Sequence, residues 1–184
     1  MSLINLHRAR FINKIYNYTR GLVAHYKFEN NFNDSAGLNP AYKVFNVLFE
    51  SLGLVNKAAR FFGDNNYLVV PNSSDLSFTD GVNDLPFTVS FWLNFDSIKD
   101  RQWFISKRGG QTDREYQIVY NNGSFYVNIF NPTTLTAWFG IQYEFPVIVG
   151  EWYHLVVTYD GSKSLGGLKM YFDGVKVGLS IAMG

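Results

Sequence analysis

Carboxylate side chains are the first candidates for chemistry, because two of them at a fixed separation can cleave a glycosidic bond. The closest candidates are Asp113 and Glu115, with Arg114 between them and two glycines shortly before them. Exposed charge clusters of this kind are usually solvated turns, so we expect a turn here and no polysaccharide hydrolysis. The three histidines lie far apart without a matching nucleophile motif, and His154 is expected to be structural. The sequence therefore predicts a protein that is not an enzyme.

Aromatic and amide side chains accumulate in the middle of the chain, and a carbohydrate site needs both. Aromatic rings stack on the apolar faces of sugars, and amides bond to the sugar hydroxyl groups. The candidates for carbohydrate binding are Trp103, Tyr120, Asn121, Tyr126 and Trp138. For each aromatic residue, a place in the hydrophobic core is the alternative, because a folded domain must bury most of its large apolar side chains.

The first 20 residues differ from the rest, since they contain four Lys or Arg but no Asp, Glu, Gly or Pro. Ile4, Phe11, Ile15 and Tyr18 recur at helical spacing and form a short apolar stripe. An isolated helix of this length is marginal in water, so the stripe needs a surface to pack on. That surface is the arm's own domain, a membrane or another protein chain. We take docking on another chain, in a homo-oligomeric or hetero-oligomeric assembly, as the hypothesis to test.

Period-two alternation of side chains organises the remainder of the chain. From Trp152 to Tyr159, alternate residues are apolar, as expected for a strand with one buried face. Asp173-Gly174 and Asn121-Asn122-Gly123 are typical of tight turns between antiparallel strands. Further strands are expected at 22–28, 58–62, 67–70, 87–95, 103–107, 116–120, 125–130, 135–141 and 168–172. Residues 39–56 fit either a short helix or a strand.

These elements predict an all-β fold, a two-sheet antiparallel jelly-roll sandwich that carries a short helical or extended N-terminal arm. The arm is expected to span residues 1–20 and the sandwich residues 21–184. No repeat, low-complexity tract or linker divides the second range.

Several stretches resemble the laminin G-like jelly rolls of the concanavalin A-like lectin and glucanase superfamily. They are GLVAHYKF at 21–28, NDSAG at 33–37, ARFFGD at 59–64 with YLVVP at 67–71, FTVSFWL at 87–93 and GEWYHLVVTYDG at 150–161, followed by LKMYFDGVKV at 168–177. The resemblance implies a concanavalin A-like sandwich. In related domains further strands follow the last of these stretches, so we expect either another element in their place or an open sheet edge after Gly178.

The resemblance also implies a calcium site, since the loop at 33–37 matches a family motif that binds calcium in some relatives. Asp34, Asn33 and Asn30 are the candidate ligands, because hard cations prefer several oxygen donors. A single carboxylate rarely completes such a shell, so a purely structural turn is the alternative. Calcium is the one candidate cofactor.

Composition limits the classes of partner. The net charge is +1 and the pI about 7.9, so bulk charge indicates neither nucleic acid nor membrane binding. Cysteine is absent, which excludes disulfides and thiol chemistry. No apolar run is long enough to span a membrane, and the basic N-terminus is no ordinary signal peptide.

The sequence therefore favours a non-catalytic recognition or assembly domain, for which a virion or extracellular surface is the suspected location. A calcium-dependent carbohydrate-binding module is the alternative, and a glycoside hydrolase is disfavoured. Glycans and other protein chains are the expected partners.

Overall fold

The structure of the chain is a computed structural model. It describes residues 21–63, 65–80, 82–108, 114–130 and 138–183. The chain divides into two compact units, Met1–Leu76 and Ser77–Gly184. The predicted arm and its docking residues, Ile4, Phe11, Ile15 and Tyr18, lie outside the described residues, so the boundary at residue 20 stays a prediction.

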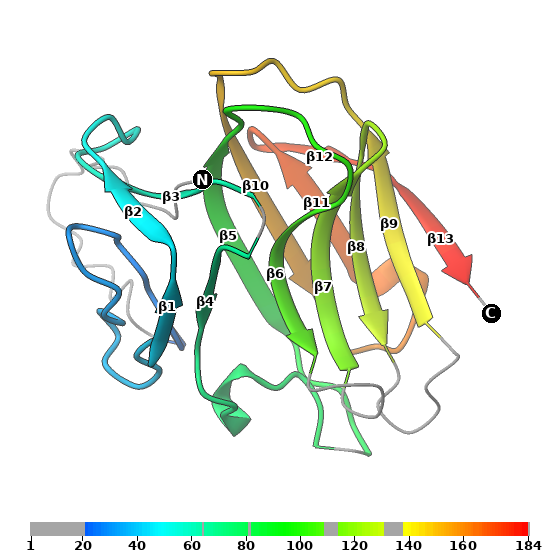
Figure 1. The fold of residues 1–184 in the computed structure, drawn as a ribbon. Coiled ribbons are helices and arrows are strands. Elements are labelled where there is room, and N and C mark those ends of the chain that lie inside the picture. The colour runs from blue at the N-terminus through cyan, green and yellow to red at the C-terminus, as the bar shows by residue number, and fades with distance from the viewer. Residues whose placement is uncertain (1–20, 64, 81, 109–113, 131–137, 184) are drawn as a thin grey trace, which may run out of the picture. The chain divides into compact units, whose positions relative to one another are not determined.

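The first unit contains two small antiparallel sheets, in which β1 pairs with β4 and β2 with β3 (Figure 1). The elements are β1 (Lys43–Phe45), β2 (Val47–Glu50), β3 (Ala58–Phe61), β4 (Tyr67–Val69) and the 3-10 helix η1 (Ser74–Leu76). Phe28, Val47 and Ala59 form its buried core, against which Tyr26, Phe32, Phe49, Phe61 and Leu68 pack partly buried. Residues 39–56, left open by the sequence, therefore contain strands.

The strand expected at residues 22–28 is reduced to one isolated bridge between Tyr26 and Asp34. The prediction was wrong because Phe28 has a φ of 58°, in the left-handed region, which ends any extended run. The backbone of His25 is held instead by the Asp34 side chain and by the amide of Ser35. Polar bonds replace a β-ladder in this segment.

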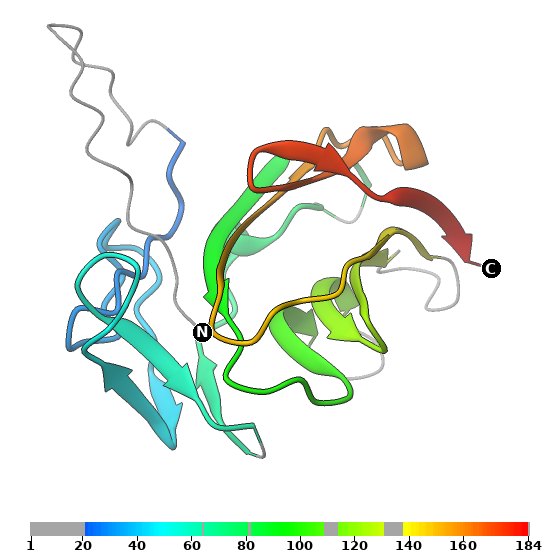
Figure 2. The same ribbon diagram turned by 90° about the horizontal axis from the view of Figure 1, so that it is seen from above.

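The second unit is a sandwich of two antiparallel sheets. One has four strands in the order β12-β11-β10-β5, and the other has five in the order β13-β9-β8-β7-β6. Figures 1 and 2 show the two sheets of this unit facing each other. The elements are β5 (Phe87–Asn94), β6 (Gln102–Arg108), β7 (Arg114–Asn121), β8 (Ser124–Phe130), β9 (Trp138–Glu144), β10 (Trp152–Tyr159), the 3-10 helix η2 (Leu165–Gly167), β11 (Leu168–Phe172), β12 (Val175–Val177) and β13 (Leu179–Met183). The all-β jelly-roll prediction is confirmed.

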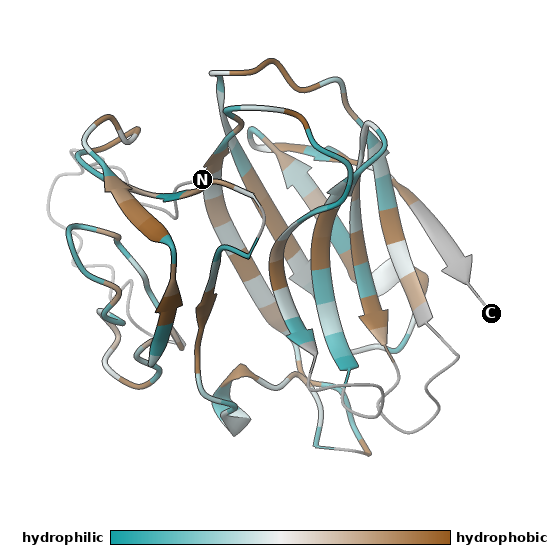
Figure 3. Cartoon of the chain, in the orientation of Figure 1, coloured by the Kyte–Doolittle hydropathy of each residue, from teal (hydrophilic) through white to brown (hydrophobic). Residues whose placement is uncertain are grey.

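The core of the second unit is aromatic and lies between its two sheets. The ring centroids of Phe125 on β8 and Phe172 on β11 are 5.2 Å apart, and those of Phe91 on β5 and Phe104 on β6 are 5.8 Å apart. Tyr153, Leu155, Val157 and Tyr159 are buried, as the alternation in β10 predicted. Figure 3 shows the corresponding alternation of hydrophobic and hydrophilic residues along the strands. Each sheet therefore has one face toward the core of the unit and one face directed away from it.

Both predicted turns form, because glycine and its neighbour adopt the positive φ that tight hairpins need. Asn122 and Gly123 have φ of 47° and 79°, and Asp173 and Gly174 have φ of 48° and 81°. The segment after Gly178 forms β13, which pairs with β9 in the five-stranded sheet. Another element thus follows the β11–β12 hairpin, which was the first of the two expected alternatives. No helix among the described residues is long and apolar enough to cross a membrane.

Candidate functional site

The outward face of the five-stranded sheet gathers aromatic and amide side chains from consecutive strands. The register places Trp103 of β6 beside Val119 of β7, Val119 beside Tyr126 of β8, and Tyr126 beside Gln142 of β9. Residues paired across a ladder lie on the same face, so these four side chains form one row. Val119 is buried within the row, whereas the Trp103 side chain is 50% exposed. We call this surface the amide–aromatic face.

Two neighbouring rows extend this face with polar side chains. One contains Gln117, Asn128 and Gly140, and the other contains Asn121 and Ser124. The Gln142 amide donates a hydrogen bond to the Ser124 hydroxyl at 3.2 Å, which ties two of the rows together. Amides that donate and accept hydrogen bonds therefore surround the two aromatic side chains.

Most of the predicted carbohydrate-binding residues lie on this face. Trp103, Asn121 and Tyr126 belong to it, and Trp138 has the matching register position in β9, although its side chain is outside the described part. Tyr120 does not belong to it. This residue is 2% exposed and packs against Phe95 and Phe125 in the core.

The error at Tyr120 has an identifiable cause. The two-residue turn at 122–123 pairs Asn121 with Ser124, and therefore Tyr120 with Phe125. Phe125 faces the core, and paired residues share a face, so Tyr120 faces the core as well. The hairpin signal, combined with strict alternation, was sufficient to separate Tyr120 from Tyr126.

Arg101 holds the outer end of the aromatic row. Its guanidinium carbon lies 5.7 Å from the centre of the Trp103 ring, within the range of a cation–π contact. Arg101 has a φ of 58°, so the chain turns immediately before β6 and brings the cation over the ring. The contact orients Trp103 while leaving half of its side chain in solvent.

Glu115 is not part of a solvated turn, and that prediction was wrong. It lies in β7, is 4% exposed, and forms an ion pair with Lys107 at 2.6 Å. It also accepts hydrogen bonds from the Ser77 hydroxyl at 2.7 Å and the Phe78 amide at 3.0 Å. These bonds fasten the segment before β5 to β7. Asp113, the other candidate carboxylate, lies outside the described residues.

A second cluster lies on the outward face of the four-stranded sheet. The Trp92 and His154 rings stack at 4.8 Å, and the Ser90 hydroxyl lies 2.9 Å from His154 Nε2. Burial lowers the pKa of His154, and Asp173 opposes that effect only in part. No local pattern in the sequence indicates this cluster, because Ser90, Trp92 and His154 meet only through the β5–β10 register.

Ser90 and His154 have the separation of a nucleophile and its base, but the described residues show no further part of a catalytic site beside them. Such sites also need a group that orients the second imidazole nitrogen and donors for the developing oxyanion. Asp173 accepts a hydrogen bond from the backbone amide of His154 rather than from its ring. The contacts described for this cluster thus serve to position the Trp92 ring.

Asp34, the candidate calcium ligand, is 7% exposed and surrounded by backbone donors. Its Oδ1 accepts hydrogen bonds from the amides of His25 at 2.7 Å and Ala36 at 2.8 Å. Its Oδ2 accepts from Leu38 at 3.1 Å and Asn39 at 2.9 Å. Burial raises the pKa of Asp34, but these four bonds outweigh burial and leave the pKa lowered.

This arrangement does not fit a calcium shell. The four amide hydrogens point at the oxygen lone pairs that a cation would use. Asn33 is engaged through its backbone amide with the Asn31 side chain, and Asn30 turns the chain with a φ of 58°. Across the described ranges, no group of three His, Cys, Asp or Glu could hold a metal. Calcium binding by Asp34, Asn33 and Asn30 stays a prediction, and the contacts favour a structural role.

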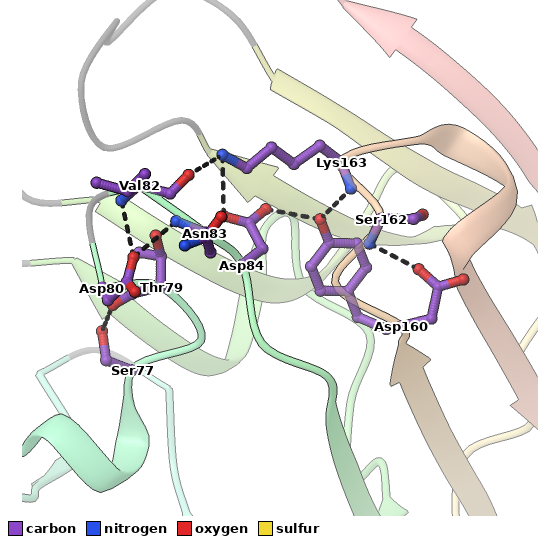
Figure 4. A network of polar contacts seen from close by, with 10 residues as sticks. Ser77, Thr79, Asp80, Val82, Asn83, Asp84, Asp160, Ser162 and Lys163 are labelled. Atoms are coloured by element: carbon purple, nitrogen blue, oxygen red, sulfur yellow. Dashed lines mark hydrogen bonds and ion pairs between the residues drawn. The ribbon is translucent and has the colours of Figure 1, made fainter.

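Two loops at one end of the second unit are fastened together by the polar network in Figure 4. Tyr159 donates a hydrogen bond to Asp84 Oδ2 at 2.7 Å and accepts one from the Lys163 amide at 2.9 Å. The Lys163 ammonium donates to the Val82 carbonyl at 2.5 Å and lies 4.0 Å from Asp84 Oδ1. Burial, with Asp84 second, raises the pKa of Tyr159, so its hydroxyl remains a donor at neutral pH. These contacts give the loops a structural role.

Comparison with known proteins agrees with the sandwich. A model of the concanavalin A-like lectin/glucanases superfamily, of the laminin G type, matches residues 62–184. No curated protein matches the chain. The matched range includes every strand of the amide–aromatic face and both sheets of the second unit. The chain therefore belongs to the concanavalin A-like lectin/glucanase superfamily.

Proposed function

We propose that the chain is a non-catalytic recognition protein that binds uncharged glycans on the amide–aromatic face. The observation that carries this proposal is the row in which Trp103 and Tyr126 flank Val119 beside the Gln142 amide. Aromatic rings provide apolar platforms for sugar rings, and neighbouring amides accept and donate hydrogen bonds to hydroxyl groups. The superfamily is compatible with this activity, but its fold alone does not select it.

The lack of charge on the face favours a neutral ligand. Its described side chains are aromatic, amide, hydroxyl or aliphatic, apart from Glu144 at the end of β9, the ion-paired Glu115 and Arg101 over the Trp103 ring. Nucleic acids and other polyanions require several cations along the contact surface, whereas the described part of this face has Arg101 at one end. A polyol with alternating apolar and hydroxyl surface matches the side chains better.

The same face offers little support for glycoside hydrolysis. Hydrolysis needs two carboxyl groups about 5 to 9.5 Å apart on either side of the scissile bond. Glu115 is committed to Lys107, Ser77 and the Phe78 amide, and it therefore makes a poor general acid or nucleophile. The proposal accordingly assigns binding without turnover. It also assigns no role to calcium, because Asp34 is engaged with backbone amides in the first unit.

Assembly is the second candidate function, and the exposed apolar side chains of the first unit favour it. Leu48, Leu52 and Phe62 are among them, with exposed fractions of 58%, 82% and 49%. Contiguous apolar surface in solvent commonly marks a contact site, and these side chains are the candidates for such a surface. Under this candidate the chain is a structural component of a larger particle, for example at a virion surface, and the arm at residues 1–20 docks on a neighbouring chain.

A glycan array with the full chain, followed by calorimetric titration of the best ligand, tests the main proposal. Trp103→Ala should weaken binding by about tenfold, or ~1.4 kcal/mol, because it removes the most exposed platform. Trp92→Ala is the matched control, since Trp92 lies on the outward face of the other sheet. Equal losses from both substitutions, or a folded protein that binds no glycan on the array, would contradict the proposal.

A further inference from the structure

Asn128 combines burial with an unused acceptor at the centre of the amide–aromatic face. It lies in β8, two residues from Tyr126, and is 5% exposed. Its Oδ1 is buried and has no hydrogen-bond partner among the described residues. In folded proteins almost all buried polar atoms have such a partner. An unpaired acceptor in this position therefore needs an explanation.

Gly140 is the residue opposite Asn128, and it explains how the amide fits there. The register pairs Asn128 with Gly140 of β9. A Cβ atom at residue 140 would overlap the Val127 carbonyl oxygen and lie 2.9 Å from Asn128 Oδ1. Glycine is thus required by space. The Asn128 amide lies against the bare backbone of Gly140 and fills the space that a side chain at residue 140 would take.

Aromatic and amide side chains lie next to Asn128 on this face. Tyr126 and Gln142 form the neighbouring cross-strand pair, and Gln117 of β7 is the cross-strand partner of Asn128 on its other side. The two glutamines are long, unbranched and only partly buried, and a ligand that displaces Gln142 must replace its hydrogen bond to Ser124. A ring stacked on Tyr126 would then bring its hydroxyl groups to the position above Gly140.

We infer that Asn128 is the specificity-determining acceptor of this face, and that its Oδ1 receives a hydrogen bond from one ring hydroxyl of a bound glycan. The inference rests on the proposed glycan-binding function and adds which residue selects among glycans. A buried acceptor discriminates strongly, because a ligand without the matching donor leaves it unpaired. The site therefore selects a sugar by the position of one hydroxyl group rather than by charge.

The inference predicts that stability and binding respond in opposite directions to one substitution. Asn128→Leu keeps the approximate shape of the side chain and removes the unpaired acceptor. The free protein should become more stable, because replacing an unsatisfied buried polar group with an apolar one removes its desolvation cost. Affinity for the glycan should fall at least tenfold.

The test uses the full chain and a panel of methyl glycosides, with the monodeoxy form of each, in calorimetric titrations and thermal melts. A raised melting temperature together with a tenfold or larger loss of affinity in Asn128→Leu supports the inference. The wild-type protein should also bind one monodeoxy glycoside more weakly than its parent glycoside. Asn128→Leu should bind that parent and its monodeoxy form with equal affinity. If Asn128→Leu does not fold, Asn128→Asp, which keeps the acceptor oxygen, should bind better than Asn128→Ala.

Two outcomes separate the failure of this inference from that of the proposed function. Wild-type affinity in Asn128→Leu, combined with a loss in Trp103→Ala, overturns the role of Asn128 and leaves glycan recognition standing. If the wild-type protein binds no glycoside on the panel and no glycan on the array, recognition itself is overturned, and this inference falls with it.

Discussion

Each of the two compact units of the chain is stabilised internally by a different kind of interaction. The second unit, Ser77–Gly184, buries an aromatic core between a four-stranded and a five-stranded sheet. The first, Met1–Leu76, has two short two-stranded sheets around a small core of Phe28, Val47 and Ala59. Much of its order comes from one carboxylate, Asp34, that collects four backbone amides. Packing therefore dominates one unit and polar loop contacts dominate the other.

This difference also separates the candidate roles. Tightly packed sheets hold their outward side chains rigidly, which favours a preorganised binding site such as the amide–aromatic face. Small cores leave apolar side chains unburied, and many exposed ones belong to the first unit: Leu38, Tyr42, Val44, Phe45, Leu48, Leu52, Leu54, Phe62 and Tyr67. We therefore propose recognition as the role of the second unit and contact with other surfaces as that of the first.

The largest expected effect tests the claim that packing dominates the second unit. Phe125→Ala should lower the free energy of unfolding by about 3–5 kcal/mol, because the ring is fully buried and its loss leaves a cavity. All four tryptophans lie in the second unit, so tryptophan fluorescence in a denaturant titration reports on that unit alone. Phe45→Ala, followed by amide hydrogen exchange in the first unit, is the matched control. Phe45 is 43% exposed, and its removal should cost no more than about 1 kcal/mol.

A smaller effect tests the polar anchoring of the first unit. Asp34→Ala should cost about 2–4 kcal/mol, since it leaves partly buried backbone amides without their acceptor. Amide hydrogen exchange at Ala36, Leu38 and Asn39 should accelerate, while the tryptophan signal of the second unit changes little. The melting curve of the wild-type protein should be the same in calcium and in EDTA. A calcium-dependent rise that Asp34→Ala abolishes would restore the metal assignment.

The two units should lose stability at different pH values, because Asp34 titrates in the first unit and His154 in the second. The pKa of Asp34 is lowered, so its stabilising contribution is complete above its unfolded value near 3.8 and is lost as the pH falls below that. The pKa of His154 is also lowered, by burial, so the folded state resists its protonation. Stability of the second unit should therefore begin to fall below about pH 6.5, well before that of the first.

Fluorescence-detected and exchange-detected unfolding, measured from pH 7.5 to pH 3, would check this order. In the second unit, His154→Gln should reduce the loss of stability between pH 6.5 and 5. It should not change the loss of stability of the first unit at lower pH. Identical pH profiles for the two units, unaffected by either His154→Gln or Asp34→Asn, would contradict the separation.

The sequence predicted those parts of the fold that depend on local signals. Alternation located β10, and the glycines at 123 and 174 located two hairpins, because side-chain period and positive φ are properties of neighbouring residues. The strand expected at 22–28 failed, because the left-handed backbone of Phe28 and the bonds from Asp34 override an extended pattern. In the first unit, polar contacts therefore override the local preference of these residues for a strand.

The candidate site was predictable in kind but not in arrangement. Trp103, Asn121 and Tyr126 were candidates from residue type, whereas their meeting on one face depends on ladders that join distant residues. A bulge between Trp103 and Ile105 shifts the register of β6, and nothing in the local sequence announces it. The Glu115–Lys107 ion pair and the Ser90–His154 contact depend in the same way on register between strands.

The smallest expected effect on stability concerns the apolar surface of the first unit, and it carries the test of assembly. Leu48→Ser and Leu52→Ser should each change the free energy of unfolding by no more than about 0.5 kcal/mol, because these side chains gain little from burial within their own unit. If the first unit is a contact surface, the double variant should reduce oligomerisation in light scattering while its melting curve stays unchanged. Leu179→Ser in the second unit is the matched control, because Leu179 is 78% exposed, and it should affect neither measurement.

A marked loss of stability in the double variant would show that Leu48 and Leu52 stabilise the unit itself, and the contrast between the units would then be weaker than their exposure indicates. An unchanged oligomeric state, with an unchanged melt, would instead remove the main support for assembly and leave glycan recognition by the second unit as the function to pursue.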